Sequence, residues 1–230
     1  MSEKYRIEHD SMGEVSVPAD RTWGAQTQRS LDNFRIGSDR MPPSLIRAII
    51  MIKEAAAEAN HRLIPERMTE GKKLAITGAC EKLLSDFPED EFPLSVWQTG
   101  SGTQTNMNVN EVIAHVGNAA AGDGLLHPND DVNMSQSTND VFPSAIQLAY
   151  LLLAEKRLLP ALERLSGAFS RLEDKYAGTV KCGRTHLMDA VPVTFGQEAG
   201  GWRSTVDFDA ELIERSLPPL RRIPRPRPWL

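Results

Sequence analysis

Cysteine is scarce in this sequence, with Cys80 and Cys182 the two examples in 230 residues. They lie far apart, and neither belongs to a CxxC motif or to the Cys and His spacing of a zinc site. A small secreted domain stapled by disulfides is therefore excluded. The pattern favours two reduced thiols in a cytosolic protein over a disulfide or a bound metal.

A net positive charge and long apolar runs are missing as well. The 31 acidic residues outnumber the 26 basic ones, and the body of the chain has no basic patch for nucleic acid. The apolar run LAYLLLA (148–154) is too short to cross a membrane, and the opening MSEKYRIEHD lacks the apolar core of a signal peptide. We therefore expect a cytoplasmic protein that binds neither nucleic acid nor a membrane. An anionic substrate would have to be held by a few well-placed donors.

Helical periodicity dominates what is present, so we expect a mainly α fold. A chain of 230 residues is long enough for one sizeable core or two modest domains. Apolar residues recur at helical spacing from Pro42 to just before Pro65, and again from a predicted N-cap at Thr69 to about Leu84. A further helix is predicted over residues 195–217.

The longest predicted helix runs from about Asp140 to Tyr176, with Thr138 or Asn139 as its cap. At 1.5 Å per residue it would span roughly 50 Å. Pro160 lies inside it and should kink the helix or open its hydrogen-bond ladder. A helix of this length in a small protein indicates a bundle shared with other subunits.

Three polar segments separate the helices. Residues 100–110 are almost all small or amide-bearing and precede a helix predicted to begin at Glu111, an arrangement that suits either an anion site or an ordinary capped loop. The segment lacks the GK[ST] of a P-loop. Residues 127–131 form a polar turn too crowded for a metal site. Residues 181–198 combine Arg, Thr, His and Asp in one loop, although a lone His between helices is more often structural.

The two ends of the chain differ from its middle. We interpret Tyr5–Gly37 as an irregular arm with short β-like pieces and one or two helical turns. The last fifteen residues hold five of the 15 prolines, so a helix beyond Pro218 is not expected and the tail should be disordered. The predicted organisation is an N-terminal domain over 1–138, part of a central helical bundle over 139–217, and an Arg/Pro-rich tail over 218–230.

Four segments together resemble the class II fumarases of the aspartase/fumarase superfamily. They are WGAQTQRSLDNF (23–34), TGSGTQTNMNVNEVIA (99–114), HPNDDVNMSQSTND (127–140) and GRTHLMDAVPVTFGQE (183–198). They occur in the family's order and approximate spacing, and the likeness extends to about Leu220, which corresponds to the N-terminal half of a typical member. His186 and the wording TGSGTQ are typical of fumarases, whereas aspartases place Gln at the His position. Aspartate ammonia-lyase is therefore the alternative enzyme.

The resemblance implies a carbon–oxygen lyase of the tricarboxylic acid cycle that reversibly hydrates fumarate to (S)-malate without a metal or organic cofactor. The reaction needs acid/base transfer and donors for the negative charge that develops on a carboxylate. His186 would transfer protons through a bound water. The substrate would be bound by Ser101, Gly102, Thr103, Ser137, Thr138, Asn139 and Thr185. A second dicarboxylate site, outside the catalytic centre, would comprise His127, Pro128, Asn129 and Asp130.

One element of the family pattern is missing. Class II fumarases carry a third segment of the form GSSxMPxKxN, which supplies the serine assigned as base, and it does not occur in these 230 residues. The family forms homotetramers and builds each active site from three subunits. The resemblance therefore implies either a fumarase or a catalytically inactive fragment that oligomerises or binds dicarboxylates. The abrupt change to RRIPRPRPWL resembles a shift of reading frame with early termination, and the uncovered bundle faces predict self-association.

Overall fold

A computed structural model describes residues 4–122 and 124–222. The described chain is mainly helical, as predicted, and it divides into two compact units, one ending at Ala149 and the other beginning at Tyr150. The sequence-based boundary after residue 138 stays a prediction. No helix within the described ranges is long and apolar enough to span a bilayer.

The first unit opens with a β-hairpin where an irregular arm was predicted. Strands β1 (Tyr5–Asp10) and β2 (Gly13–Pro18) pair antiparallel, with Tyr5 opposite Pro18. Asp10 Oδ1 accepts the Met12 N–H at 2.8 Å, which closes the turn. Helix α1 (Ala25–Asn33) follows, so the helical turns expected within residues 23–34 are confirmed.

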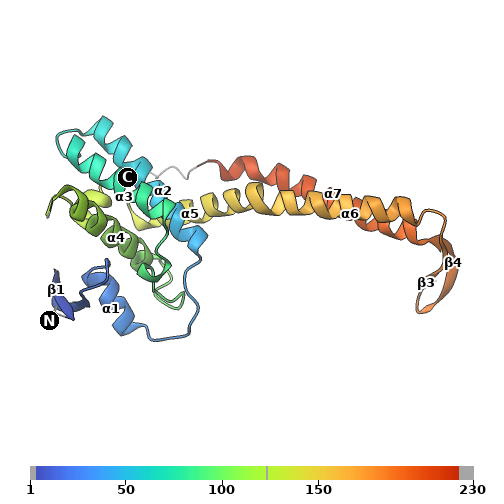
Figure 1. Ribbon diagram of the computed structural model, residues 1–230, viewed down its shortest axis with the longest axis horizontal. Coiled ribbons are helices and arrows are strands. Elements are labelled where there is room, and N and C mark those ends of the chain that lie inside the picture. The colour runs from blue at the N-terminus through green and yellow to red at the C-terminus, as the bar shows by residue number, and fades with distance from the viewer. Residues whose placement is uncertain (1–3, 123, 223–230) are drawn as a thin grey trace, which may run out of the picture. The chain divides into compact units, whose positions relative to one another are not determined.

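Helices make up most of the first unit (Figure 1), and they supply most of the buried residues of its core. Helix α2 (Pro43–Leu63) and helix α3 (Glu70–Ser85) begin and end close to the predicted positions. The Thr69 hydroxyl caps α3 by accepting the Lys72 N–H at 3.4 Å. A short 3-10 turn, η1 (Glu89–Glu91), follows α3.

Helix α4 (Thr103–Ala121) begins well before Glu111, so the prediction of a loop through residue 110 is wrong. Asparagine is a weak helix former because its side chain competes for backbone groups. In α4 two asparagines of the first turns, Asn106 and Asn108, find tertiary partners instead. Asn108 donates to Glu91 O at 3.1 Å, and Asn106 donates to Asn133 Oδ1 at 3.1 Å. Burial in the core therefore overrides the local preference.

The long helical run is confirmed, with an interruption where Pro160 was expected to cause one. A π-turn, η2 (Pro128–Val132), precedes α5 (Thr138–Leu153), and α5 continues through a π-segment, η3 (Ala154–Leu158), into α6 (Leu159–Lys175). Pro160 has no N–H for the regular ladder, and the wider turn lies directly before it.

The cap of α5 differs from the prediction. Ser137, rather than Thr138 or Asn139, accepts the Asn139 N–H on its hydroxyl at 3.2 Å. Its carbonyl also accepts the N–H groups of Asp140 and Val141, each at 3.0 Å. Ser137 therefore occupies the N-cap, and Thr138 is the first helical residue.

The second unit contains a helical pair joined by a β-hairpin. Strands β3 (Val180–Thr185) and β4 (Met188–Thr194) pair antiparallel, so the loop predicted around His186 is a hairpin. Helix α7 (Phe195–Leu220) then returns beside α6 (Figure 1). The antiparallel direction is marked by contacts between the two helices: Glu173 with Arg203 at 2.9 Å, and Ser166 with Asp207 at 2.5 Å.

The end of α7 corrects the predicted start of the tail. The helix continues through Pro218 and Pro219 to Leu220. Leu217 is buried and packs with Leu151 and Ala154, so apolar burial holds this last turn in helical form despite the two prolines. The prediction of disorder for residues 223–230 lies outside the described residues.

Candidate active site

The N-terminus of α4 presents hydroxyl groups around a glycine. Gly102 is the N-cap and adopts a φ of +74°, a left-handed conformation that glycine takes without steric cost. The hydroxyls of Ser101 and Thr103 lie 3.0 Å apart on the exposed side. Gln98 Oε1 accepts the Thr105 N–H at 3.1 Å, satisfying one donor of the first turn.

The N-terminus of α5 lies against that of α4. The Asn106 side-chain amide, on the first turns of α4, donates to Thr138 Oγ1 at 3.1 Å. A Cβ added to Gly102 would lie 2.5 Å from the ring of Phe142, on the second turn of α5. The predicted residues 101–103 and 137–139 are therefore brought to adjoining helix starts within one unit. Ser137 and Asn139 are exposed, and Thr138 is half-buried.

This arrangement suits an anion. The backbone N–H groups of a helix start have no partner within the helix, and the helix dipole makes that end positive. Two such ends and several hydroxyls converge here, so a carboxylate could accept hydrogen bonds from both helices.

Thr185 and His186 lie in the second unit, at the tip of the β3–β4 hairpin. Thr185 pairs with Met188, and the two residues between them, His186 and Leu187, have φ angles of +51° and +62°. Positive φ at both central positions is the signature of a type I′ turn, the turn that fits the twist of a two-residue hairpin. The hairpin thus presents the imidazole at an exposed, sharply turned position.

The second predicted dicarboxylate site forms the entrance to η2. The Asp130 N–H donates to His127 Nδ1 at 3.1 Å, and the His127 N–H donates to Asp131 Oδ2 at 2.7 Å. His127 Nδ1 also lies 3.4 Å from Asp130 Oδ2, so the ring and the carboxylate of this turn are close neighbours. Asn118 fixes the preceding turn by exchanging two hydrogen bonds with the Leu126 backbone, at 2.8 and 2.9 Å.

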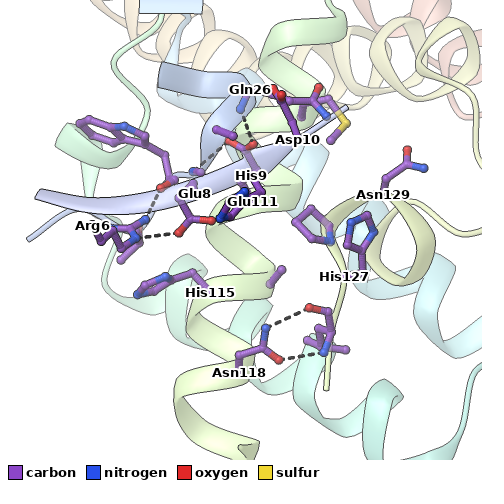
Figure 2. A pocket seen from close by; sticks show the side chains of 18 of the residues that line it. Arg6, Glu8, His9, Asp10, Gln26, Glu111, His115, Asn118, His127 and Asn129 are labelled. Carbon is purple, nitrogen blue, oxygen red and sulfur yellow. Dashed lines mark hydrogen bonds and ion pairs between the residues drawn. The ribbon is translucent and has the colours of Figure 1, made fainter. Parts of the chain in front are cut away.

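Three of the four residues of that predicted site line a cavity of about 460 Å³ in the first unit, seen in Figure 2. His127, Pro128 and Asn129 contribute to its lining, while Asp130 lies outside it. On the β1 side Arg6 donates to the carbonyls of Arg21 and Trp23, each at 2.5 Å. The Arg6 guanidinium therefore stabilises the chain before α1.

Sequence reasoning missed the role of Glu111, which links α4 to α1. Its carboxylate is buried and accepts four hydrogen bonds: from the N–H groups of Gly24 at 3.0 Å, Gln26 at 2.8 Å and Thr27 at 3.1 Å, and from the Thr27 hydroxyl at 2.6 Å. Burial raises the pKa of Glu111, while these donors act in the opposite direction. A Glu in an apolar stretch of α4 gave no sequence signal for this contact, because its partners lie more than 80 residues away.

Sequence reasoning also missed Lys53, which lies in the middle of α2 and is fully buried. Its Nζ donates to Asn133 Oδ1 at 2.8 Å and to Gln136 Oε1 at 3.1 Å. Burial lowers the pKa of Lys53 from 10.5 to about 7. A buried ammonium next to the start of α5 adds positive charge near the residues predicted to bind the substrate.

Comparison with known proteins places these features in a family. A family model described as a lyase matches residues 13–224. The chain belongs to this lyase family. Its fold is that of the aspartase/fumarase superfamily, and the resemblance inferred from the four sequence segments is confirmed.

The curated relatives indicate which members of the family this chain resembles. A class II fumarate hydratase of Oceanobacillus iheyensis is 49% identical over 223 residues, which are 95% of this chain and 48% of the relative. A class II fumarate hydratase of Bacillus subtilis is 47% identical over 224 residues, with 96% and 48% covered. The chain thus spans about half the length of the curated relatives it matches.

Two solved structures also resemble this chain. A recombinant class II fumarase from Schistosoma mansoni superimposes with a TM-score of 0.90 at 39% identity, covering 95% of this chain and 47% of the other. A fumarate lyase:delta crystallin from Brucella melitensis gives a TM-score of 0.89 at 42% identity, with 95% and 52% covered.

Proposed function

We propose that this chain catalyses the reversible hydration of fumarate to (S)-malate, as a subunit of a class II fumarate hydratase. The observation that carries the proposal is the meeting of two hydroxyl-bearing helix starts through the Asn106–Thr138 hydrogen bond and the Gly102–Phe142 contact. Membership of the lyase family and the names of the similar relatives support the same reaction.

Each residue has a defined part in the proposed reaction. In the dehydration direction a base takes the proton from C3 of malate, the adjoining carboxylate gains negative charge, and the C2–O bond then breaks as the hydroxyl leaves as water. Donors from residues 101–103 and 137–139 would stabilise the charged carboxylate. Thr185 would be a further donor to the substrate, and His186 would transfer a proton through water, since an imidazole exchanges protons near neutral pH. No residue role in this scheme requires a metal or an organic cofactor.

The proposed assembly is a homotetramer in which each site combines segments from three subunits. Support comes from α6 and α7, which expose apolar side chains that would suit a shared helical bundle. Leu165 and Leu172 are among them on α6, and Trp202, Phe208 and Leu212 on α7. The residues at the entrance to η2, His127, Pro128, Asn129 and Asp130, are proposed as a second dicarboxylate site.

A second candidate function is dicarboxylate binding without turnover. It is favoured by the placement of the predicted residues: those at 101–103 and 137–139 adjoin one another in the first unit, whereas His186 lies at the hairpin tip of the second unit. Under this alternative the two helix starts would bind a dicarboxylate, and no proton would be transferred.

The deciding experiment follows fumarate absorbance with the purified 230-residue chain supplied with (S)-malate, and separately with L-aspartate. Turnover of malate that falls by about 100-fold or more in His186→Asn supports the proposal. Asp189→Asn, a charge-removing change in the same hairpin, serves as the control and should leave the rate unchanged. Fumarate released from aspartate would favour the ammonia-lyase. Fumarate binding measured by calorimetry without turnover would establish the second candidate instead.

A further inference from the structure

Lys53 is held by the turn that leads into α5. Its ammonium contacts the amide oxygens of Asn133 and Gln136 at 2.8 and 3.1 Å, so the partners of this buried charge are neutral. A buried charge without a carboxylate is costly to fold, because burial removes the hydration of the ion and an amide dipole replaces it incompletely. The position of this amine therefore matters through the groups that it contacts.

The contacts of Lys53 fix the orientation of two side-chain amides. An ammonium only donates hydrogen bonds, so the Asn133 side chain must turn its oxygen toward Lys53. The same Asn133 Oδ1 accepts from Asn106 Nδ2 at 3.1 Å, and so Asn106 must present its NH₂ group. That NH₂ group also donates to Thr138 Oγ1 at 3.1 Å.

The orientation of the Asn106 amide determines how the Thr138 hydroxyl can form hydrogen bonds. A hydroxyl has one hydrogen to donate and two lone pairs that accept. Because Asn106 occupies a lone pair of Thr138, the hydroxyl hydrogen is directed elsewhere and is available to an anion. With the Asn106 amide reversed, its oxygen would instead take that hydrogen.

Lys53 also anchors the backbone that precedes the helix. Gln136, its second partner, donates to Val132 O at 3.0 Å, and the Asn133 side chain donates to Gln136 O at 3.2 Å. Ser135, within this turn, has a φ of +58°, which is strained for a residue other than glycine. The turn that places Ser137 and Thr138 is thus stabilised by amides that converge on one buried amine.

We propose that Lys53 is a positioning residue which, through Asn133 and Asn106, holds the Thr138 hydroxyl as a hydrogen-bond donor for a substrate carboxylate. The inference rests on the proposed function, because it requires a dicarboxylate at the start of α5. Lys53 acts through other side chains and is not itself a catalytic residue.

The charge of Lys53 should make binding depend on pH. Its pKa lies at about 7 because of burial. The titratable group acting on it is Cys80 from α3, whose thiol pKa is raised by burial, so it stays neutral at physiological pH. Asp131 in η2 is paired with Lys72 at 2.6 Å, and α4 contributes the neutral Asn106. Fumarate affinity should therefore fall as the pH rises through about 7 and the ammonium loses its proton.

The test is calorimetric titration of fumarate into the full chain between pH 6 and 8.5, with Lys53→Met as the variant. We expect the affinity to fall about tenfold at the acidic end, and the decrease in affinity between pH 6 and 8.5 to become smaller because the contribution of Lys53 is removed. Lys82→Met removes the same charge from an exposed position of α3 and should change neither quantity. Equal affinity and an unchanged pH profile in Lys53→Met would overturn the inference while the proposed function stands.

A second measurement on the unsubstituted chain needs no variant to fold. Linkage requires that an anion bound more tightly to the charged form raises the pKa of the amine it favours. Saturating fumarate should move the NMR titration midpoint of the Lys53 side chain upward, whereas a fixed midpoint with bound fumarate contradicts the inference. If the chain binds neither fumarate nor malate, the proposed function fails and this inference fails with it.

Discussion

Gly102 lies directly against the ring of Phe142. A Cβ at Gly102 would come within 2.5 Å of two ring carbons, and the residue also has a φ of +74°. The N-cap residue of α4 thus packs closely against a residue on the second turn of α5. The predicted anion site depends on this close approach, because the approach brings the hydroxyl-bearing starts of the two helices together.

We therefore expect Gly102→Ala to destabilise the first unit by roughly 2–4 kcal/mol, since the new methyl adds overpacking to a left-handed backbone strain. Urea denaturation followed by circular dichroism measures the change. Gly100→Ala is the matched control, because a Cβ there meets nothing within 4 Å. Similar unfolding midpoints for the two variants would show that Phe142 moves aside at little cost.

A different prediction concerns the link between α1 and α4. Removing the Glu111 carboxylate leaves the N–H groups of Gly24, Gln26 and Thr27 without their acceptor in a buried place. We expect Glu111→Ala to lower the free energy of unfolding by at least about 2 kcal/mol. Hydrogen exchange should report the loss first in α1. Full protection of the α1 amides in the variant would argue that other groups cap this helix.

Much of this fold was predictable because it follows from local periodicity. Helices α2, α3 and α7 and the long run through α5 and α6 carry apolar residues at helical spacing, and Thr69 and Pro160 mark a cap and an interruption. These signals act over a few residues, so they are present in the sequence before the chain folds.

The errors have identifiable physical causes. The first turns of α4 are helical because Asn106 and Asn108 bond to residues far along the chain, and no local pattern reports such partners. The sequence predicts a loop in place of the β3–β4 hairpin because the turn residues, His186 and Leu187, are not the Asn-Gly that usually marks a type I′ turn. Lys53 gave no local signal either, because its partners Asn133 and Gln136 lie about 80 residues further along the chain.

The candidate site was predictable to a different extent. From composition alone, residues 100–110 were compatible with either an anion site or a capped loop. The likeness of four segments to one family identified the positions, and the comparisons confirm the family. The roles of Ser101, Thr138 and His186 remain predictions. Neither composition nor the family likeness indicated that Lys53 and Asn106 both hydrogen-bond to Asn133, or that Asn106 also donates to Thr138.

The tip of the β3–β4 hairpin allows a prediction on turn strain. Leu187 adopts a φ of +62° while fully exposed, so its side chain gains no packing energy to offset the left-handed conformation. We expect Leu187→Gly to stabilise the hairpin by about 1 kcal/mol, visible as slower amide exchange in β3 and β4. Met188→Gly, one residue further and in a strand, should accelerate exchange instead. Faster exchange in both variants would mean that strain at Leu187 is negligible.

The last prediction concerns stability and pH. The pKa of Lys53 is about 7 in the folded chain and near 10.5 when the chain unfolds. Between these values the unfolded state binds more protons, so the contribution of this group to stability rises as the pH increases from about 7 toward 10.5. Lys53→Met removes that titration, and it also removes the cost of a buried charge.

We therefore expect Lys53→Met to be more stable than the unsubstituted chain at pH 6, by a margin on the order of 4 kcal/mol at most, because lost hydrogen bonds to Asn133 and Gln136 offset part of the gain. The margin should shrink as the pH rises toward 10. Urea denaturation at several pH values measures it, with Lys82→Met as the surface control. A constant difference between Lys53→Met and the unsubstituted chain at all pH values would show that Lys53 is solvated in the folded chain. The combination of a stabilising substitution with weaker fumarate binding would be the expected sign of a residue retained for its site, since stability alone would favour methionine there.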